Sequence, residues 1–321
     1  MMLLGWCLAL AACTTNLASP IQPGPYLVVL GVAQDGGVPQ AGNRNDPAWQ
    51  DESQRRLVVS LALVDPVNNK RFLFEATPDI REQLHLLDTI APTTRPAPAL
   101  GGIFLTHAHM GHYLGLAHLG HEVMGASAIP VHVMPRFAEY LRNNGPWDQL
   151  VRYENIDLQV LTANTAVQLS DSLSVTPIPV PHRQEYSEVV AFRIDGPGRS
   201  ALFLPDIDSW HEWDATGIRI EAVLATVDIA FLDATFFANG EIPGRDMSGF
   251  PHPFVTTTMQ RLANLPASER SKVHFIHFNH TNPVLRPGSA AYAEVLKAGF
   301  RVAQRGDRYD LLNQVFLQVH Q

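Results

Sequence analysis

The stretch Thr106-His107-Ala108-His109-Met110-Gly111-His112 decides what this chain is expected to be, and it follows the apolar run Gly102-Ile103-Phe104-Leu105. The apolar run is typical of a short buried strand, so the histidines lie where that strand ends. His107 and His109 are two residues apart and share one face of an extended chain. Neutral imidazole is the commonest protein ligand for zinc and also suits iron. The stretch therefore predicts a metal site rather than a histidine-rich surface loop.

The overall composition is that of an ordinary globular protein. The 321 residues are 46% hydrophobic and 17% charged, which is enough for a sizeable core. The formal net charge is −8, and no run of lysine or arginine occurs. Nucleic acid is therefore not expected as a partner, and a small-molecule substrate is expected instead.

The first twenty residues differ from the rest of the chain. They carry no charge, and both cysteines of the protein, Cys7 and Cys13, lie among them. The apolar part is too short to span a bilayer, and Leu10-Ala11-Ala12-Cys13 matches a bacterial lipoprotein box, although no Lys or Arg precedes it. We expect residues 1–20 to be an export signal, with lipid on Cys13 tethering the protein to the periplasmic face of a bacterial membrane.

The remaining residues, 24–321, have the pattern of a single domain. Short apolar strands alternate with isolated helices, without an internal repeat or a long linker. Helices are expected near residues 113–124, 136–143, 256–265 and 290–297. Two packed sheets with helices outside them fit this pattern best. Because cysteine is absent from this part, any metal must be held by histidine or carboxylate side chains.

A glycine-rich turn follows the first predicted strand, with the sequence Gly31-Val32-Ala33-Gln34-Asp35-Gly36-Gly37-Val38-Pro39. Its glycine spacing is not that of a phosphate-binding loop, and the lysine of such a loop is missing. Glycine has no Cβ atom, so we expect this turn to bring its backbone close to a functional site.

Four further predicted strands end at a residue of metal-ligand type: His182, Asp206, Asp233 and His277. Loops that leave one edge of a sheet can bring such side chains to one point, and such loops commonly carry function. A single residue of this kind is more often a capped strand end. Together with the three clustered histidines, however, the four indicate a shared metal site.

The order His-x-His-x-x-His, then a later His, an Asp and a His, resembles the metallo-β-lactamase superfamily. The resemblance covers nearly all of the chain after the signal and implies a four-layer αββα sandwich of the α+β class. Within the superfamily the chain is most similar to the branch that contains the pyrroloquinoline quinone biosynthesis protein B and the phosphonate-pathway phosphodiesterase. The motifs that carry this similarity are Leu30-Gly31…Gly36-Gly37-Val38-Pro39, Thr77-Pro78-Asp79-Ile80-Arg81, Val180-Pro181-His182-Arg183-Gln184-Glu185-Tyr186, Leu204-Pro205-Asp206-Ile207-Asp208, Leu232-Asp233-Ala234-Thr235-Phe236-Phe237 and Phe278-Asn279-His280-Thr281-Asn282-Pro283.

The resemblance also implies a ligand set. The first metal would be held by His107, His109 and His182. The second would be held by His112, Asp206 and His277, with Asp206 bridging both metals. Zinc is the expected cofactor, as one or two ions, with iron or manganese as alternatives. Asp206 is also the expected catalytic residue, because it would orient the attacking hydroxide.

Two departures from the pattern of the family matter. The superfamily usually has aspartate where this chain has Gly111, so the second metal loses a carboxylate. Asp208, Asp233, His280 or a water would have to replace it, or that site is weak or empty. The quinone-biosynthesis proteins instead keep the Asp-His and lack the paired histidines, and their cysteine knuckle is absent from residues 40–49 here. A function in quinone biosynthesis is therefore not carried over.

A divalent metal on three imidazoles lowers the pKa of its bound water to about 7, which supplies hydroxide at neutral pH. We therefore predict a metal-dependent hydrolase that acts on an ester-type bond: a phosphodiester, a lactone or another ester. Arg183, Asn279 and His280 are weaker candidates for substrate binding. The competing interpretations are an iron-dependent oxygenase and a metal-binding protein without hydrolase activity.

Overall fold

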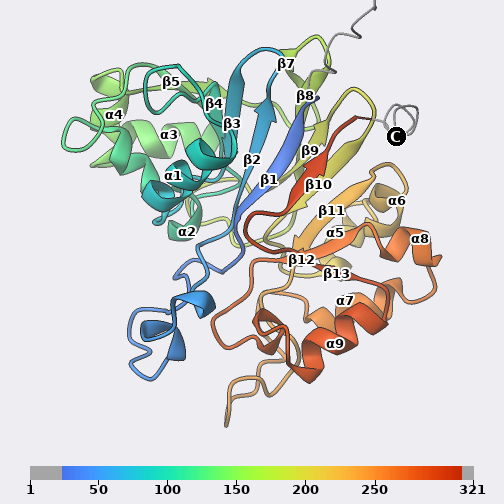
Figure 1. Ribbon diagram of the computed structural model, residues 1–321. Coiled ribbons are helices and arrows are strands. Elements are labelled where there is room, and N and C mark those ends of the chain that lie inside the picture. Colours follow the sequence, from blue (N-terminus) through green and yellow to red (C-terminus); the bar gives the residue numbers. More distant parts are fainter. Residues whose placement is uncertain (1–23, 313–321) are drawn as a thin grey trace, which may run out of the picture.

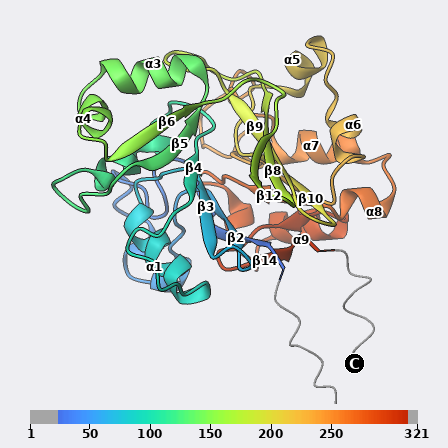
Figure 2. The same ribbon diagram turned by 90° about the horizontal axis from the view of Figure 1, so that it is seen from above.

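The computed structural model describes residues 24–312, and it shows two seven-stranded sheets packed face to face with helices on both outer sides (Figures 1 and 2). The predicted four-layer sandwich is confirmed. The predicted signal and lipoprotein box in residues 1–20 lie outside the described residues. Within the described range, no helix combines the length and the apolar character that crossing a bilayer requires.

The N-terminal sheet has the strand order β14-β1-β2-β3-β4-β5-β6. Strands β1 to β3 are antiparallel, whereas β3 to β6 are parallel, so helical connections cover its outer face. Its strands are β1 (Tyr26–Gly31), β2 (Ser60–Asp65), β3 (Lys70–Phe74), β4 (Gly102–Phe104), β5 (Ile129–Val133), β6 (Ile156–Val160) and β14 (Arg308–Asp310). Its helices are α1 (Ile80–Ile90), α2 (Met110–Tyr113), α3 (Pro135–Asn143) and α4 (Trp147–Arg152).

The C-terminal sheet repeats this plan with the order β13-β12-β11-β10-β9-β8-β7, antiparallel from β7 to β10 and parallel from β10 to β13. Its strands are β7 (Val167–Ser170), β8 (Leu173–Pro179), β9 (Val190–Asp195), β10 (Ser200–Leu204), β11 (Ile229–Asp233), β12 (Val273–Ile276) and β13 (Arg301–Val302). Its helices are α5 (Trp210–Ala215), α6 (Ile220–Leu224), α7 (Val255–Leu262), α8 (Ala267–Arg270) and α9 (Ala290–Lys297).

Phenylalanine side chains from both sheets form the centre of the core. The ring of Phe74 on β3 stacks on Phe104 of β4 at 5.3 Å between centroids, and it meets Phe192 and Phe203 of the other sheet edge to face. All four rings are fully buried, and burying each one stabilises the fold by roughly 1.5–3 kcal/mol. Because Phe104 is the last residue of β4, this packing also fixes the start of the histidine stretch.

The helix predicted over residues 113–124 is the clearest error at the level of secondary structure. The chain forms only the short helix α2 there, followed by the 3-10 segment η3 (Leu114–Leu119). Gly115 explains the difference, because its backbone packs so closely on residues 76–77 that an added Cβ would lie 2.1 Å from Thr77 O. Glycine also disfavours a regular helix. The other three predicted helices are confirmed as α3, α7 and α9.

Candidate metal centre

All six predicted ligands lie together where four strands end. Three of them follow β4, while the other three follow β8, β10 and β12 of the opposite sheet. Five are buried and one is partly exposed at the surface. The six are His107, His109, His112, His182, Asp206 and His277.

The first ligand set consists of His107, His109 and His182. His107 Nε2 lies 2.9 Å from His109 Nδ1, and His182 Nε2 lies 3.3 Å from that same atom. Three imidazole nitrogens therefore point at one position, which is the arrangement that a metal ion with histidine ligands requires. The structure thus brings His107 and His109, which are neighbours in sequence, together with the distant His182.

Asp206 stands between the first set and the remaining histidines. Its Oδ2 atom lies 3.0 Å from His112 Nε2 and 3.3 Å from His277 Nε2. Its Oδ1 atom lies 3.7 Å from His182 Nε2, on the side of the first set. His107 Nε2 of the first set lies 3.9 Å from Oδ2, so the Asp206 carboxylate is close to imidazoles of both groups, where a bridging ligand is expected.

Four of the five imidazoles also have a hydrogen-bond partner on the nitrogen that faces away from this centre, whereas His112 Nδ1 approaches Glu75 without a hydrogen bond. Such outer partners fix the ring orientation and are typical of metal-bound histidines. The outer contacts are His107 Nδ1 to Thr106 Oγ1 (2.8 Å), His109 Nε2 to Glu185 Oε2 (3.1 Å), His112 Nδ1 to Glu75 Oε1 (3.2 Å), His182 Nδ1 to Asp208 Oδ1 (2.7 Å) and His277 Nδ1 to Thr235 Oγ1 (2.9 Å).

The buried charges at the centre shift the pKa values of its members in opposite directions. Burial holds the pKa of His107 well below its usual value. Burial acts in the same sense on His112, but the carboxylates of Glu75 and Asp206 outweigh it and raise that pKa well above the usual value. Asp206 resists the effect of burial because His277 and His112 lower its pKa. These shifts favour a neutral His107 and an ionised Asp206, which are the protonation states that metal ligands need, whereas the carboxylates around His112 favour a positive charge at its position.

Two residues of the centre adopt a left-handed backbone conformation that only glycine adopts easily. Glu75 has φ +77° and His277 has φ +67°, and both side chains are buried. Such conformations cost about 1–3 kcal/mol each and persist where the surroundings enforce them, often at functional sites. The backbone is thus bent at the two points where a strand delivers a side chain to the centre.

The donor atoms left without partners identify a place for a cation. Asp206 Oδ2 and His277 Nε2 are buried and have no hydrogen bond, and Asp35 Oδ1 is in the same state. Orphaned buried polar atoms are costly unless an ion or water binds them. Because the donors are imidazole nitrogens and carboxylate oxygens, the set suits a divalent metal such as zinc.

The three residues proposed as substitutes for a carboxylate at position 111 are engaged elsewhere. Asp208 holds His182 of the first set. Asp233 accepts hydrogen bonds from the backbone of Ile207 (3.1 Å) and Thr235 (2.9 Å), so it positions the segment after Asp206. His280 lines a pocket with Asp46 and Arg56, away from the six ligands.

The predicted substrate-binding residues are dispersed. Arg183 is exposed, and its positive charge adds to the effect of burial in lowering the pKa of His109, which places it near the first set. Asn279 is occupied by hydrogen bonds to Gln34 and Thr281, which is a structural role. His280 lies in the pocket described above, so only Arg183 stays close to the histidine centre.

Three residues at the centre were not predicted as site residues: Asp35, Glu75 and Glu185. Asp35 lay inside the glycine-rich turn that was expected to approach a site, so the turn itself was the available signal. Glu75 directly follows β3 and Glu185 follows His182 in a loop, but an isolated carboxylate in the sequence gives no specific signal of a metal site. His252 Nδ1 lies 2.8 Å from Asp233 Oδ2 and 3.6 Å from Asp206 Oδ1.

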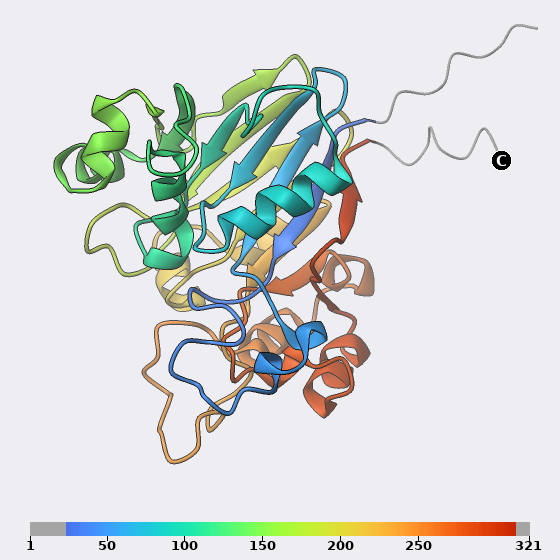
Figure 3. The same ribbon diagram turned by 60° about the vertical axis from the view of Figure 1, so that its left-hand side comes forward.

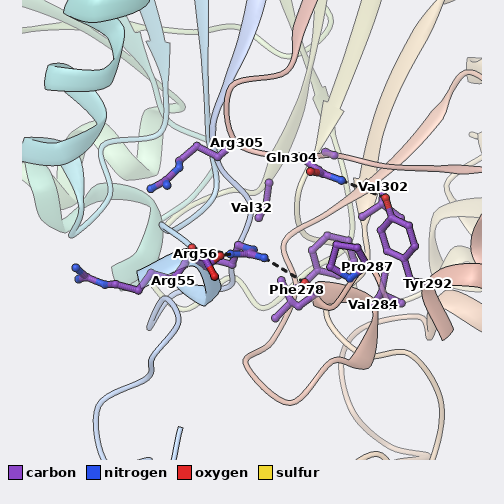
Figure 4. A pocket seen from close by; sticks show the side chains of 13 residues that line it. Val32, Arg55, Arg56, Phe278, Val284, Pro287, Tyr292, Val302, Gln304 and Arg305 are labelled. Carbon is purple, nitrogen blue, oxygen red and sulfur yellow. Dashed lines mark hydrogen bonds between the residues drawn. The ribbon is translucent and has the colours of Figure 1, made fainter. Parts of the chain in front are cut away.

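A separate pocket lies between the N-terminal loop and the last strands (Figure 4). Arg55, Arg56 and Arg305 line one side of it, and its lining includes none of the six predicted ligands. The guanidinium of Arg56 donates to the carbonyl oxygens of Ser53 (2.7 Å) and Leu285 (3.4 Å). Arg56 thereby ties the N-terminal loop to the segment that follows His277.

Comparison with known families agrees with this geometry. The family model of the β-lactamase superfamily domain matches residues 70–278, which include all four strand ends that carry the six ligands. The chain belongs to the metallo-β-lactamase superfamily. Membership of this superfamily supports a metal-dependent hydrolase at the family level.

This superfamily member is similar to individual proteins of the branch that its motifs indicated. The coenzyme PQQ synthesis protein B of Xanthomonas campestris is 26% identical over 307 residues, or 87% of this chain and 98% of that protein. The Zn²⁺-bound PqqB of Methylobacterium extorquens has a TM-score of 0.72 at 23% identity, over 89% of this chain and 100% of that chain. A diphosphatase of the PhnP family has a TM-score of 0.62 at 21% identity, over 89% and 96%. These structures establish the shared fold.

Proposed function

We propose that this protein hydrolyses an ester-type bond with the help of zinc bound at the histidine centre. The observation that carries the proposal is the orientation of the five imidazoles. Each turns one nitrogen toward the Asp206 carboxylate or the neighbouring histidines. The other nitrogen has an outer hydrogen-bond partner in four of them, and in His112 it faces Glu75 at 3.2 Å. A structural histidine cluster without a metal would not need every ring fixed in this way.

The residues divide the chemical work. His107, His109 and His182 would hold one ion, and bound zinc would lower the pKa of a water to about 7. Asp206 would orient that water as a hydrogen-bond acceptor, because its carboxylate lies close to both groups of imidazoles. Asp208 and Thr106 keep the rings of His182 and His107 in the tautomer that leaves Nε2 free.

Arg183 favours an anionic substrate. Arg183 is exposed and directly follows His182 of the first set, where a positive charge can pair with a phosphate group. Of the three ester types considered, a phosphodiester therefore suits the centre better than a neutral lactone or carboxylic ester. Replacing Arg183 by glutamine should raise KM for a phosphodiester and leave KM for a neutral ester unchanged.

The decisive experiment is elemental analysis of protein purified without added metal, followed by assays of the zinc form. A chromogenic phosphodiester, a carboxylic ester and a lactone serve as substrates, and Asp206→Asn serves as the inactive control. Hydrolysis that needs zinc and Asp206 supports the proposal. Full zinc occupancy without any hydrolysis would leave a binding protein, and bound iron with oxygen uptake would favour the oxygenase.

We also propose that the mature protein is a lipoprotein on the periplasmic face of the membrane. Support comes from the Leu10-Ala11-Ala12-Cys13 sequence and the absence of cysteine after it. Fractionation of cells that express the full chain should place the protein with membranes, and Cys13→Ala should release it. Unchanged fractionation of the Cys13→Ala variant would overturn the anchor.

A further inference from the structure

We propose that Asp35 of the glycine-rich turn is the missing carboxylate ligand of the second metal, in place of the aspartate that the superfamily usually has at position 111. The inference rests on the proposed metal-dependent function and names the donor set of its second ion. That second set is Asp35, His112 and His277, together with the bridging Asp206. The carboxylate would thus have moved to another part of the chain while keeping its place in space.

The position of the Asp35 side chain fits a ligand. One oxygen of Asp35 and one ring nitrogen each of His112 and His277 lie within 4.8 Å of one another. Asp35 Oδ1 is 3.4 Å from His112 Nε2, and it is buried without a hydrogen bond even though 30% of the side chain is exposed. The buried His277 Nε2 is likewise without a partner. Two orphaned donors and a shared neighbour mark one position for a cation.

Gly111 and Asp35 exclude each other sterically. A Cβ atom added to Gly111 would lie 2.1 Å from Asp35 Oδ1 and 2.5 Å from Asp35 Cα, far inside van der Waals contact. A side chain at position 111 would therefore start in the volume that Asp35 already fills. A carboxylate at position 35 therefore requires a residue without a side chain at position 111.

The turn that carries Asp35 is held by main-chain hydrogen bonds next to a ligand. Gln34 N donates to Phe278 O and Phe278 N donates to Val32 O, both at 2.8 Å, and Phe278 directly follows His277. Gly37 N closes the turn on Gln34 O at 2.8 Å, with φ +66° at Gly37, a conformation that suits glycine. Main-chain hydrogen bonds thus fix the position of the backbone at Asp35 next to His277.

The test is zinc binding to the metal-free protein, measured by calorimetry and by metal analysis after equilibrium dialysis. Wild type should bind two equivalents of Zn²⁺. Asp35→Asn keeps the shape but not the charge, and it should keep the first equivalent and weaken the second by more than about 100-fold, because loss of an outer partner alone costs 10–100-fold. Glu52→Gln, an exposed carboxylate of the same loop, is the matched control and should bind like wild type.

Gly111→Ala provides a second variant that keeps every ligand side chain. Its methyl group should displace Asp35, so it too should lose the second equivalent and retain the first. Two equivalents bound with unchanged affinity in Asp35→Asn or Gly111→Ala, or a single equivalent in wild type, would overturn the inference. Because zinc is counted without a substrate, a wild type that binds two ions and hydrolyses nothing would refute the hydrolase while leaving the assignment of Asp35 intact.

Discussion

The two ligand sets of the centre differ in charge: the first consists of imidazoles alone, and the second combines imidazoles with carboxylates. The first set is three imidazoles, and it reaches the surface through His109, whose side chain is 17% exposed. In the second set, His112 alone faces three carboxylates: Asp206 at 3.0 Å, Glu75 at 3.2 Å and Asp35 at 3.4 Å. A site of neutral ligands tolerates the absence of a cation, whereas clustered buried carboxylates do not. The second set should therefore be the one that couples metal binding to the stability of the fold.

The largest effect should follow from breaking the first set. His109→Ala removes one of three imidazoles, so the first equivalent of zinc and all hydrolysis should be lost. Metal analysis and a phosphodiester assay measure both. His118→Ala, in η3 and outside the ligand sets, is the matched control and should behave as wild type. Unchanged turnover in His109→Ala would contradict the assignment of the first set.

Removal of the metal tests the second set. A ligand present at 100 times its Kd stabilises the folded state by about 2.7 kcal/mol, so zinc should raise Tm by about 5–10 °C for each filled site. Chelation should reverse the increase, since the carboxylates around His112 then lose their counter-ion. Scanning calorimetry with zinc and with chelator gives the difference. Equal Tm values in the two conditions would show that neither set binds zinc tightly.

Two variants, each removing an outer partner of one ligand set, should show that the two sets bind zinc independently. Asp208 holds His182, whereas Glu75 faces His112. Asp208→Asn should weaken only the first zinc equivalent, and Glu75→Gln only the second, each by about 10–100-fold. Stepwise titration of zinc-free protein followed by calorimetry resolves the two equivalents. Weakening of both equivalents by either variant would mean that the sets do not act separately.

The smallest effect should come from the exposed partner of the first set. Glu185 Oε2 lies 3.1 Å from His109 Nε2, but its side chain is 49% exposed to solvent. Exposed ion pairs contribute about 0–1 kcal/mol, so Glu185→Gln should weaken the first equivalent by no more than about fivefold. The same titration measures it. A loss as large as that of Asp208→Asn would show that solvent exposure does not decide the strength of an outer partner here.

Local regularities explain why much of the fold was predictable. Apolar runs such as β10 and β12 read as buried strands because both faces of the sandwich layers are covered. The helix predicted over residues 113–124 was wrong because a tertiary contact, and not a local pattern, decides the structure there. The backbone contact between Gly115 and residues 76–77 is tertiary, and no helical period in the sequence reveals it.

The centre shows the same division. His107, His109 and His112 were found because they are adjacent in sequence, and His182, Asp206 and His277 because each ends a strand and matches a superfamily motif. Asp35 was not among the predicted substitutes for a carboxylate at position 111, because those candidates all follow other strands. The glycine-rich turn was correctly expected to approach a site, but nothing in its spacing showed which side chain it would deliver.

The sequence alone determined the types of donor and the class of fold, since spacing and strand ends are local properties of the chain. The tertiary structure decided which carboxylate meets His112 and His277, because a metal ion responds to where an oxygen lies and not to its order along the chain. Main-chain bonds between the turn at residues 34–37 and Phe278 fix that place, and they arise only once both sheets have packed.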